Sequence, residues 1–198
     1  MKALAFWKTV TVDEANLLEQ FVSLLNEKQV RYCLIGGQAV NAYVEPVVSL
    51  DLDVVVAVDD LERLASPLAQ RFQLERFAHS LNVSLPASDL RVQIQLDPRY
   101  SAFVERASNR NVLGIQLPVA RLEDVLQGKI WAAEDPTCRG SKRQKDLADA
   151  GVNALGVGSW SSWEFYSHSL RNAPGLPMRS SAYLAVVRAP GRMASDRS

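Results

Sequence analysis

The strongest constraint on the fold of this chain is a glycine pair followed by two aspartates that lie two positions apart. Gly36-Gly37 ends a short apolar segment, 32–35. Asp51 and Asp53 begin a β-branched segment that runs to Val58. Glycines at the end of a strand permit a sharp turn into a helix and let backbone N–H groups approach a phosphate. Side chains two positions apart on a strand share a face, so the pattern predicts two carboxylates that converge on one site.

The spacing of apolar residues predicts that the glycines and aspartates belong to a fold that contains both helices and strands. Leucines and Phe21 recur at helical intervals after the capping-box spacing of Thr11 and Glu14, and 90–97 alternates polar with apolar residues. The predicted strands are 32–35, 51–58, 73–77, 90–97 and 112–117; the predicted helices are 11–25, 38–44, 59–68 with a kink or break at Pro67, 100–107, 121–134 and 141–154. Strands interleaved with helices favour an α/β (α+β) mixed sheet flanked by helices over a sandwich or a bundle.

The charge balance separates a folded domain from a tail. The 198 residues hold 22 basic and 22 acidic side chains, which argues against a basic body that coats a polyanion. Residues 1–150 carry a net charge of −3, whereas residues 151–198 carry +3 with nine Ser and five Gly. We therefore expect one domain at 1–155 and a poorly ordered Ser/Gly/Arg-rich, irregular tail at 156–198.

Several classes of protein are disfavoured by composition. Two cysteines are too few for a disulfide framework, and two distant histidines do not form a zinc site. No apolar run approaches the roughly 20 residues that cross a bilayer, and the first residues lack the features of a secretion signal. A cytoplasmic protein without a membrane partner is expected, and its chemistry would come from carboxylates and lysines.

The two aspartates have two possible roles: they bind a metal ion, or they are solvated acids with no binding role. The two Cα atoms of Asp51 and Asp53 would lie roughly 6.6 Å apart, at ~3.3 Å per residue, so both carboxylates can reach one or two Mg²⁺ ions. Alternatively, they are solvated acids at the start of a strand, and the glycines form an ordinary turn. The valines at 54–56 read as a buried strand, where acids need a cation or a donor to offset desolvation.

The combination of these motifs resembles the DNA-polymerase-β-type nucleotidyltransferase superfamily. Within it, the chain is most similar to the AbiE-toxin-like nucleotidyltransferases of bacterial toxin–antitoxin and phage-defence systems. Ser49, Asp51 and Asp53 match the Thr-x-Asp-x-Asp positions of that group. Lys129 resembles the lone lysine of a following helix, and Lys145 begins the Lys-Asp-x-x-Asp pattern of the next. The resemblance covers about residues 30–150.

The resemblance implies transfer of a nucleoside monophosphate from an NTP to an RNA or protein acceptor, with an antitoxin protein as a further partner. Mg²⁺ would be the cofactor, held by Asp51 and Asp53. The implied nucleotide contacts are Gly36, Gly37, Ser49, Lys129 and Lys145. The lysines have an alternative role, because their spacing also suits an exposed helix face with weak ion pairs or a snorkelling side chain.

The chain departs from the superfamily where a third carboxylate belongs. The polar positions of the segment 90–97 are Gln93, Gln95 and Asp97, so glutamine occupies the middle of the strand and Asp97 its end. A neutral amide offers an oxygen to Mg²⁺ but cannot accept a proton as a base. Gln38 follows the glycines, where a hydroxyl side chain would be able to meet a phosphate. Two hypotheses remain: an enzyme with Asp97 as its third catalytic carboxylate, or a degenerate member that binds a nucleotide or a partner.

Overall fold

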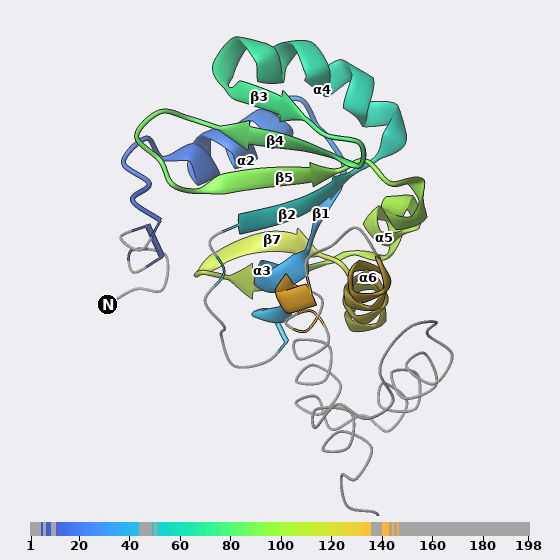
Figure 1. The fold of residues 1–198 in the computed structure, drawn as a ribbon. Coiled ribbons are helices and arrows are strands. Elements are labelled where there is room, and N and C mark those ends of the chain that lie inside the picture. The colour runs from blue at the N-terminus through green and yellow to red at the C-terminus, as the bar shows by residue number, and fades with distance from the viewer. Residues whose placement is uncertain are drawn as a thin grey trace, which may run out of the picture. The chain divides into compact units, whose positions relative to one another are not determined.

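Seven strands form one mixed sheet in the computed structural model of this chain, which describes Ala5, Trp7, Lys8, 11–43, Ser49, 51–135, 140–142, Gln144 and Asp146. The strands are β1 (Tyr32–Ile35), β2 (Asp51–Val56), β3 (Gln73–Arg76), β4 (Ser80–Ser84), β5 (Arg91–Gln95), β6 (Ser108–Val112) and β7 (Ile115–Val119). Their order is β3-β4-β5-β2-β1-β7-β6 (Figure 1). Only the pairs β2–β5 and β1–β7 are parallel, so the expectation of a mixed sheet is confirmed.

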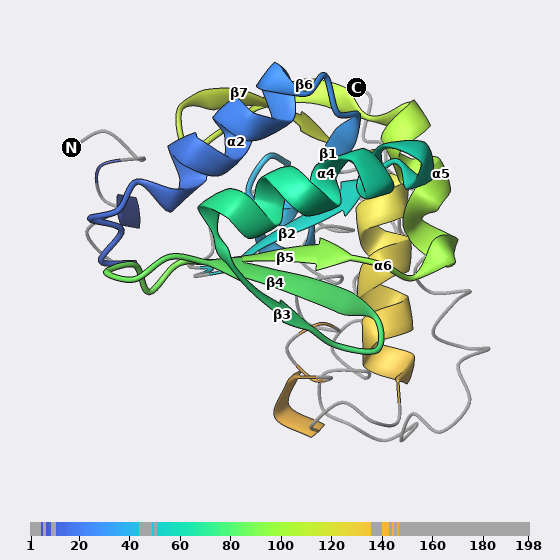
Figure 2. The same ribbon diagram turned by 90° about the horizontal axis from the view of Figure 1, so that it is seen from above.

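Helices flank this sheet on both faces. They are α2 (Leu17–Glu27), α3 (Gly36–Val40), α4 (Val58–Arg71), α5 (Ser101–Arg106) and α6 (Leu122–Glu134), with a 3₁₀ turn at Pro98–Tyr100. Helices α2 and α4 lie on one face of the sheet and α3 lies on the other (Figures 1 and 2). The rings of Phe21 in α2 and Phe72 after α4 pack edge to face, with their centroids 6.3 Å apart. This contact stabilises the packing of α2 against α4.

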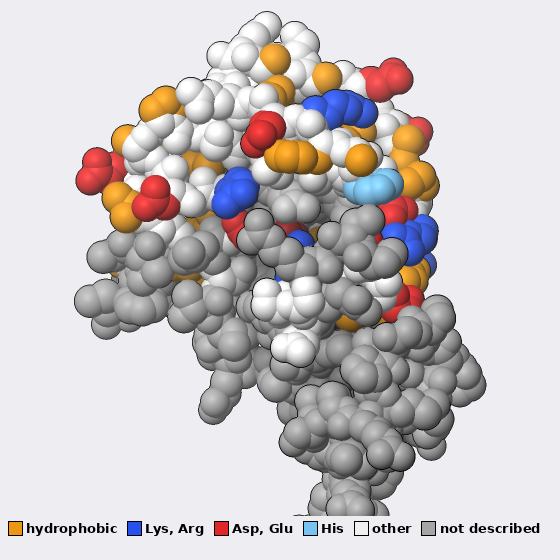
Figure 3. Space-filling view, viewed as in Figure 1, with side chains coloured by type: hydrophobic (Ala, Val, Ile, Leu, Met, Phe, Trp, Pro, Cys, Tyr) orange, Lys and Arg blue, Asp and Glu red, His pale blue; other side chains and the backbone are white. Residues whose placement is uncertain are grey.

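The two faces of the sheet differ in polarity. In β5, Val92 and Ile94 are fully buried, whereas Gln93 and Gln95 are half-buried on the opposite face. Each buried aliphatic side chain contributes about 1.5–3 kcal/mol through removal of apolar surface from water. The apolar residues therefore hold α2 and α4 to the sheet and leave the polar residues on the face of α3. Acidic and basic side chains are both visible on that side of the molecule (Figure 3).

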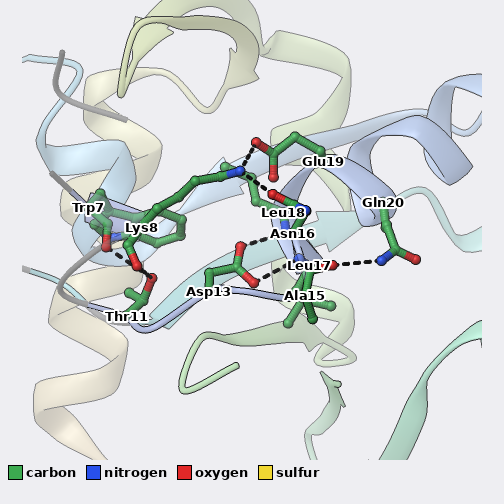
Figure 4. Close-up of polar contacts among 10 residues, drawn as sticks. All are labelled: Trp7, Lys8, Thr11, Asp13, Ala15, Asn16, Leu17, Leu18, Glu19 and Gln20. Carbon is green, nitrogen blue, oxygen red and sulfur yellow. Dashed lines mark hydrogen bonds and ion pairs between the residues drawn. The ribbon is translucent and has the colours of Figure 1, made fainter. Parts of the chain in front are cut away.

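Helix α2 begins later than predicted, at Leu17 after the N-cap residue Asn16, and Asp13 rather than Thr11 bonds its first N–H groups. The Asp13 carboxylate accepts hydrogen bonds from the N–H groups of Leu17 at 2.8 Å and Leu18 at 3.5 Å (Figure 4). A carboxylate at this position satisfies N–H groups that have no partner within the helix. Thr11 donates its hydroxyl to the carbonyl of Trp7 at 2.9 Å, so the predicted capping box at Thr11 is wrong.

Four other elements differ from the prediction. Strands β4 and β6 were not predicted, and α3 begins at Gly36 rather than at Gln38. Helix α4 includes Pro67 without a break and continues to Arg71, beyond the predicted end at residue 68. Asp59 and Asp60 lie in its first turn, where their negative charge complements the N–H end of the helix dipole.

The chain divides into two compact units, Met1–Gly128 and Lys129–Ser198. The first unit contains the whole sheet and the predicted motifs from Gly36 to Asp97. The predicted boundary at residue 155 and the predicted tail at 156–198 lie outside the described residues. Among the helices that are described, none has the length and apolar composition to cross a membrane.

Candidate functional site

The site is built around the first residues of β2. Asp53 is the register partner of Ile35 in β1 and of Gln93 in β5. Asp51 lies two residues earlier on the same face, with half of its side chain exposed. Its Oδ1 is 3.6 Å from Nε of Arg91, its own register partner in β5. The strand thus presents two carboxylates on the polar face of the sheet, as the sequence predicted.

The glycine pair lies directly against this strand. Gly36 has a φ of +66°, a conformation that favours glycine. A Cβ atom added to Gly36 would overlap the carboxylate of Asp53, at a separation under 3.0 Å from its Oδ2. A Cβ atom on Gly37 would lie 2.7 Å from Oγ of Ser49. The missing side chains are therefore what lets Asp53 and Ser49 approach the turn between β1 and α3.

Ser49 is held by two side chains that sequence reasoning did not assign to the site. Its carbonyl oxygen accepts hydrogen bonds from Nε1 of Trp7 at 2.7 Å and from Nε2 of Gln38 at 2.8 Å. Its hydroxyl donates to the carbonyl of Asp51 at 3.2 Å. The position of Gln38 directly after the glycines was a signal for its involvement. Nothing in the sequence pattern pointed to Trp7.

The donor set of this face suits a hard divalent cation. Asp51 and Asp53 supply carboxylate oxygens, and Gln93 supplies an amide oxygen beside Asp53 in the sheet. Oxygen ligands of this kind are those that Mg²⁺ prefers. Within the described part of the chain, no group of three or more His, Cys, Asp or Glu side chains is placed to hold a metal ion. The chemistry of these residues thus fits a divalent metal that would take two of its ligands from protein carboxylates.

Asp97 is not brought to this pair. It lies four positions beyond Gln93, the register partner of Asp53, and after the end of β5. Its carboxylate accepts hydrogen bonds from Arg99 through Nε at 2.8 Å and Nη2 at 2.6 Å. These bonds lower the pKa of Asp97 below its ordinary value, which makes the carboxylate a weak base. Gln95 uses its amide oxygen to accept from the N–H groups of the next two residues.

The Arg99 contact gives Asp97 a measurable role in stability. The pKa of Asp97 is lower in the folded chain than in the unfolded chain, where it is about 4. Its contribution is therefore present above pH ~4 and is lost as the pH falls through the folded pKa. Arg99 is about half exposed, so we expect Asp97→Asn to cost only about 0.5–1 kcal/mol at pH 7. Urea unfolding at pH 7 and pH 3 measures this difference, which should shrink at the lower pH; a pH-independent difference would contradict it.

The two lysines belong to the second unit. Lys129 is buried, and its ammonium donates to Oδ1 of Asp146 at 2.8 Å. Among the described residues, Oδ2 of the same buried carboxylate has no hydrogen-bond partner. Lys145 lies outside the described residues. The predicted contacts of both lysines with a triphosphate stay predictions.

Known structures share this fold. No protein-family model and no curated protein matches the chain. A solution structure of the antibiotic-resistance factor ANT(2'')-Ia aligns with a TM-score of 0.54 and 13% identity, over 87% of this chain and 94% of that one. A crystal structure of ANT(2'')-Ia in complex with adenylyl-2''-tobramycin aligns with a TM-score of 0.56 and 12% identity, over 78% and 95%.

A third structure aligns more weakly. The lincomycin-bound lincosamide antibiotic adenylyltransferase LnuA gives a TM-score of 0.48 and 15% identity, over 71% of this chain and 97% of LnuA. The two ANT(2'')-Ia alignments cover most of both chains at a higher TM-score. At 12–13% identity, these alignments show that the backbone folds are similar, and they give no information about the chemistry of individual residues. The chain therefore has a nucleotidyltransferase fold, with a mixed sheet flanked by helices.

Proposed function

We propose that this chain is a Mg²⁺-dependent nucleotidyltransferase that moves an NMP from an NTP to an acceptor hydroxyl. The observation that carries the proposal is the packing of Gly36 against the carboxylate of Asp53, with Asp51 on the same strand face. This places a glycine turn between a strand and a helix directly beside two carboxylates that would hold a cation. A nucleotidyltransferase fold around this arrangement supports the same reaction.

The reaction exchanges one phosphorus–oxygen bond for another. The acceptor oxygen attacks the α-phosphorus, the bond to the β-phosphate breaks, and pyrophosphate leaves. Mg²⁺, held by Asp51 and Asp53, would neutralise phosphate charge and lower the pKa of the attacking hydroxyl. Gly36, Gly37 and Ser49 would lie along the β- and γ-phosphates. Gln93 cannot take the acceptor's proton, so that proton passes to an aspartate or to water.

The acceptor and the cellular role come from the sequence resemblance. The Ser49-x-Asp51-x-Asp53 motif is similar to that of AbiE-toxin-like enzymes. We therefore propose an RNA or protein acceptor and a role in toxin–antitoxin or phage defence in the cytoplasm. A small DNA-binding antitoxin encoded beside this chain would support that role.

The direct test is label transfer by the full chain. The protein is incubated with Mg²⁺ and each α-labelled NTP, with total RNA and lysate protein offered as acceptors. We expect label in one acceptor fraction and in the presence of one preferred NTP. Transfer without added Mg²⁺, after treatment with a chelator, would contradict the metal requirement.

Gln93 favours a second candidate function, a module that binds a nucleotide or a partner without transfer. It occupies the position beside Asp53 where a carboxylate would add charge and a base. Binding of Mg-NTP with no transfer to either acceptor class would select this function. The bonds between the Asp97 carboxylate and Arg99 support the same candidate, because they already engage the nearest other carboxylate along this segment.

A carboxylate at position 93 should strengthen the metal site. We expect Gln93→Asp to bind Mg²⁺ about tenfold more tightly in the presence of an NTP analogue, because ligand charge tunes affinity. Calorimetric Mg²⁺ titration measures the change. Gln95→Asp is the matched control, since Gln95 is the register partner of Val55 and not of an aspartate. Equal tightening by both variants would show that general charge, and not the place beside Asp53, is responsible.

A further inference from the structure

We infer that Gln38 and Trp7 are positioning residues for the nucleotide site. They act through Ser49, which they hold at the entry to β2. The inference rests on the proposed function, in which Ser49 and the glycines form the phosphate side of the site. It adds two residues that neither the motif nor the fold likeness assigns to that site.

Both donors converge on one atom. Nε1 of Trp7 and Nε2 of Gln38 lie 2.7 and 2.8 Å from the carbonyl oxygen of Ser49. A carbonyl oxygen has two lone pairs, so these two bonds use its full capacity and define its direction. With that carbonyl fixed, the hydroxyl of Ser49 is directed toward the carbonyl of Asp51 at 3.2 Å.

The two donors are themselves buried and held. Gln38 is fully buried, and its Oε1 accepts from Nδ2 of Asn41 at 3.1 Å. Trp7 is 4% exposed, and its carbonyl accepts from the N–H and the hydroxyl of Thr11, each at 2.9 Å (Figure 4). A buried amide is costly unless it is bonded, whereas an apolar side chain of the same size would pack there without that cost. The benefit of an amide at position 38 is therefore the direction of its bond.

Ser49 has little room to move on its other side. A Cβ atom on Gly37 would lie 2.7 Å from Oγ of Ser49, so this hydroxyl lies against the bare edge of the glycine turn. The two donors and the glycine together confine Ser49, two residues before Asp51. Binding sites need such support, because their groups must stay within about 0.5 Å of the productive geometry.

The test measures nucleotide affinity and stability on the same variants of the full chain. Gln38→Met and Trp7→Phe each remove one hydrogen-bond donor to the Ser49 carbonyl. Each puts an apolar side chain of similar shape at the same position. Tyr43→Phe is the matched control, because the Tyr43 hydroxyl donates at 2.7 Å to a different backbone carbonyl, that of Ala120. The probes are α,β-non-hydrolysable analogues of ATP, GTP, CTP and UTP with Mg²⁺, titrated by calorimetry, and thermal unfolding reports stability.

We expect each of the first two variants to weaken analogue binding about three- to tenfold, the range of one hydrogen bond. Tyr43→Phe should stay within about twofold of the wild type although it loses a comparable bond. Wild-type affinity in both Gln38→Met and Trp7→Phe would overturn the inference and leave the proposed function standing. So would a parallel loss of affinity and stability in all three variants. A wild-type chain that binds none of the analogues would overturn the proposed function and this inference together.

Discussion

Replacing Asp51 and Asp53 together with asparagine is expected to lower NMP transfer about 10³-fold or more. The double variant keeps the shape of both side chains and removes both charges that would hold Mg²⁺. Stabilisation of the transferring phosphoryl group by a metal amounts to several kcal/mol, and each 1.4 kcal/mol corresponds to a factor of ten in rate. The measurement is label transfer from the preferred α-labelled NTP with saturating Mg²⁺.

The control for this loss is Asp59→Asn. The Asp59 side chain is 89% exposed and lies in the first turn of α4, away from the start of β2. Its replacement removes one surface carboxylate, so transfer should stay within about twofold of the wild type. Unfolding by urea should show that all variants remain folded. Label transfer that persists in the Asp51/Asp53 double variant would remove these residues from the site and place the chemistry elsewhere.

The site was predictable to the extent that its parts are close in sequence. Gly36 and Asp53 belong to one strand–helix–strand unit, and alternation along a strand is enough to place Asp51 and Asp53 on one face. The position of Gln93 beside Asp53 could not be predicted from the sequence, because it depends on the register between β2 and β5. A register shift of one residue would turn the side chain of Gln93 to the opposite face of the sheet. The Trp7 bond to Ser49 spans 42 positions and has no local signal.

The fold, like the site, was predictable where local sequence determines it and not where pairing between strands does. The alternation of 90–97 predicted the two faces of β5, and the buried Val92 and Ile94 confirm it. Strand β6 has the sequence SNRNV, which carries almost no β-branched or aromatic residue, and four of its five positions are exposed. It exists because β7 offers it an antiparallel partner, and such pairing overrides local propensity. The first N–H groups of α2 donate to the carboxylate of Asp13, which lies before the N-cap residue Asn16, and not to Thr11.

A methyl group at position 36 should disable the site while leaving most of the fold intact. A Cβ atom there would overlap the Asp53 carboxylate, so the carboxylate or the glycine turn must shift by about 1 Å. Misplacement of a reacting group by 1 Å costs on the order of 10²-fold in rate. We expect Gly36→Ala to lower transfer by about that factor and to weaken Mg²⁺ binding, as measured by label transfer and calorimetric titration.

Gly114→Ala separates the effect of the clash from the effect of backbone strain. Gly114 also has a positive φ, +86°, but a Cβ atom added there meets nothing within 4 Å. Alanine at either position adopts a disfavoured backbone conformation and should destabilise the chain by about 1 kcal/mol. Only Gly36→Ala also displaces Asp53, so only this variant should lose transfer and metal affinity. Equal losses in both variants would mean that strain alone is responsible, and that the approach of Gly36 to Asp53 has no part in the chemistry.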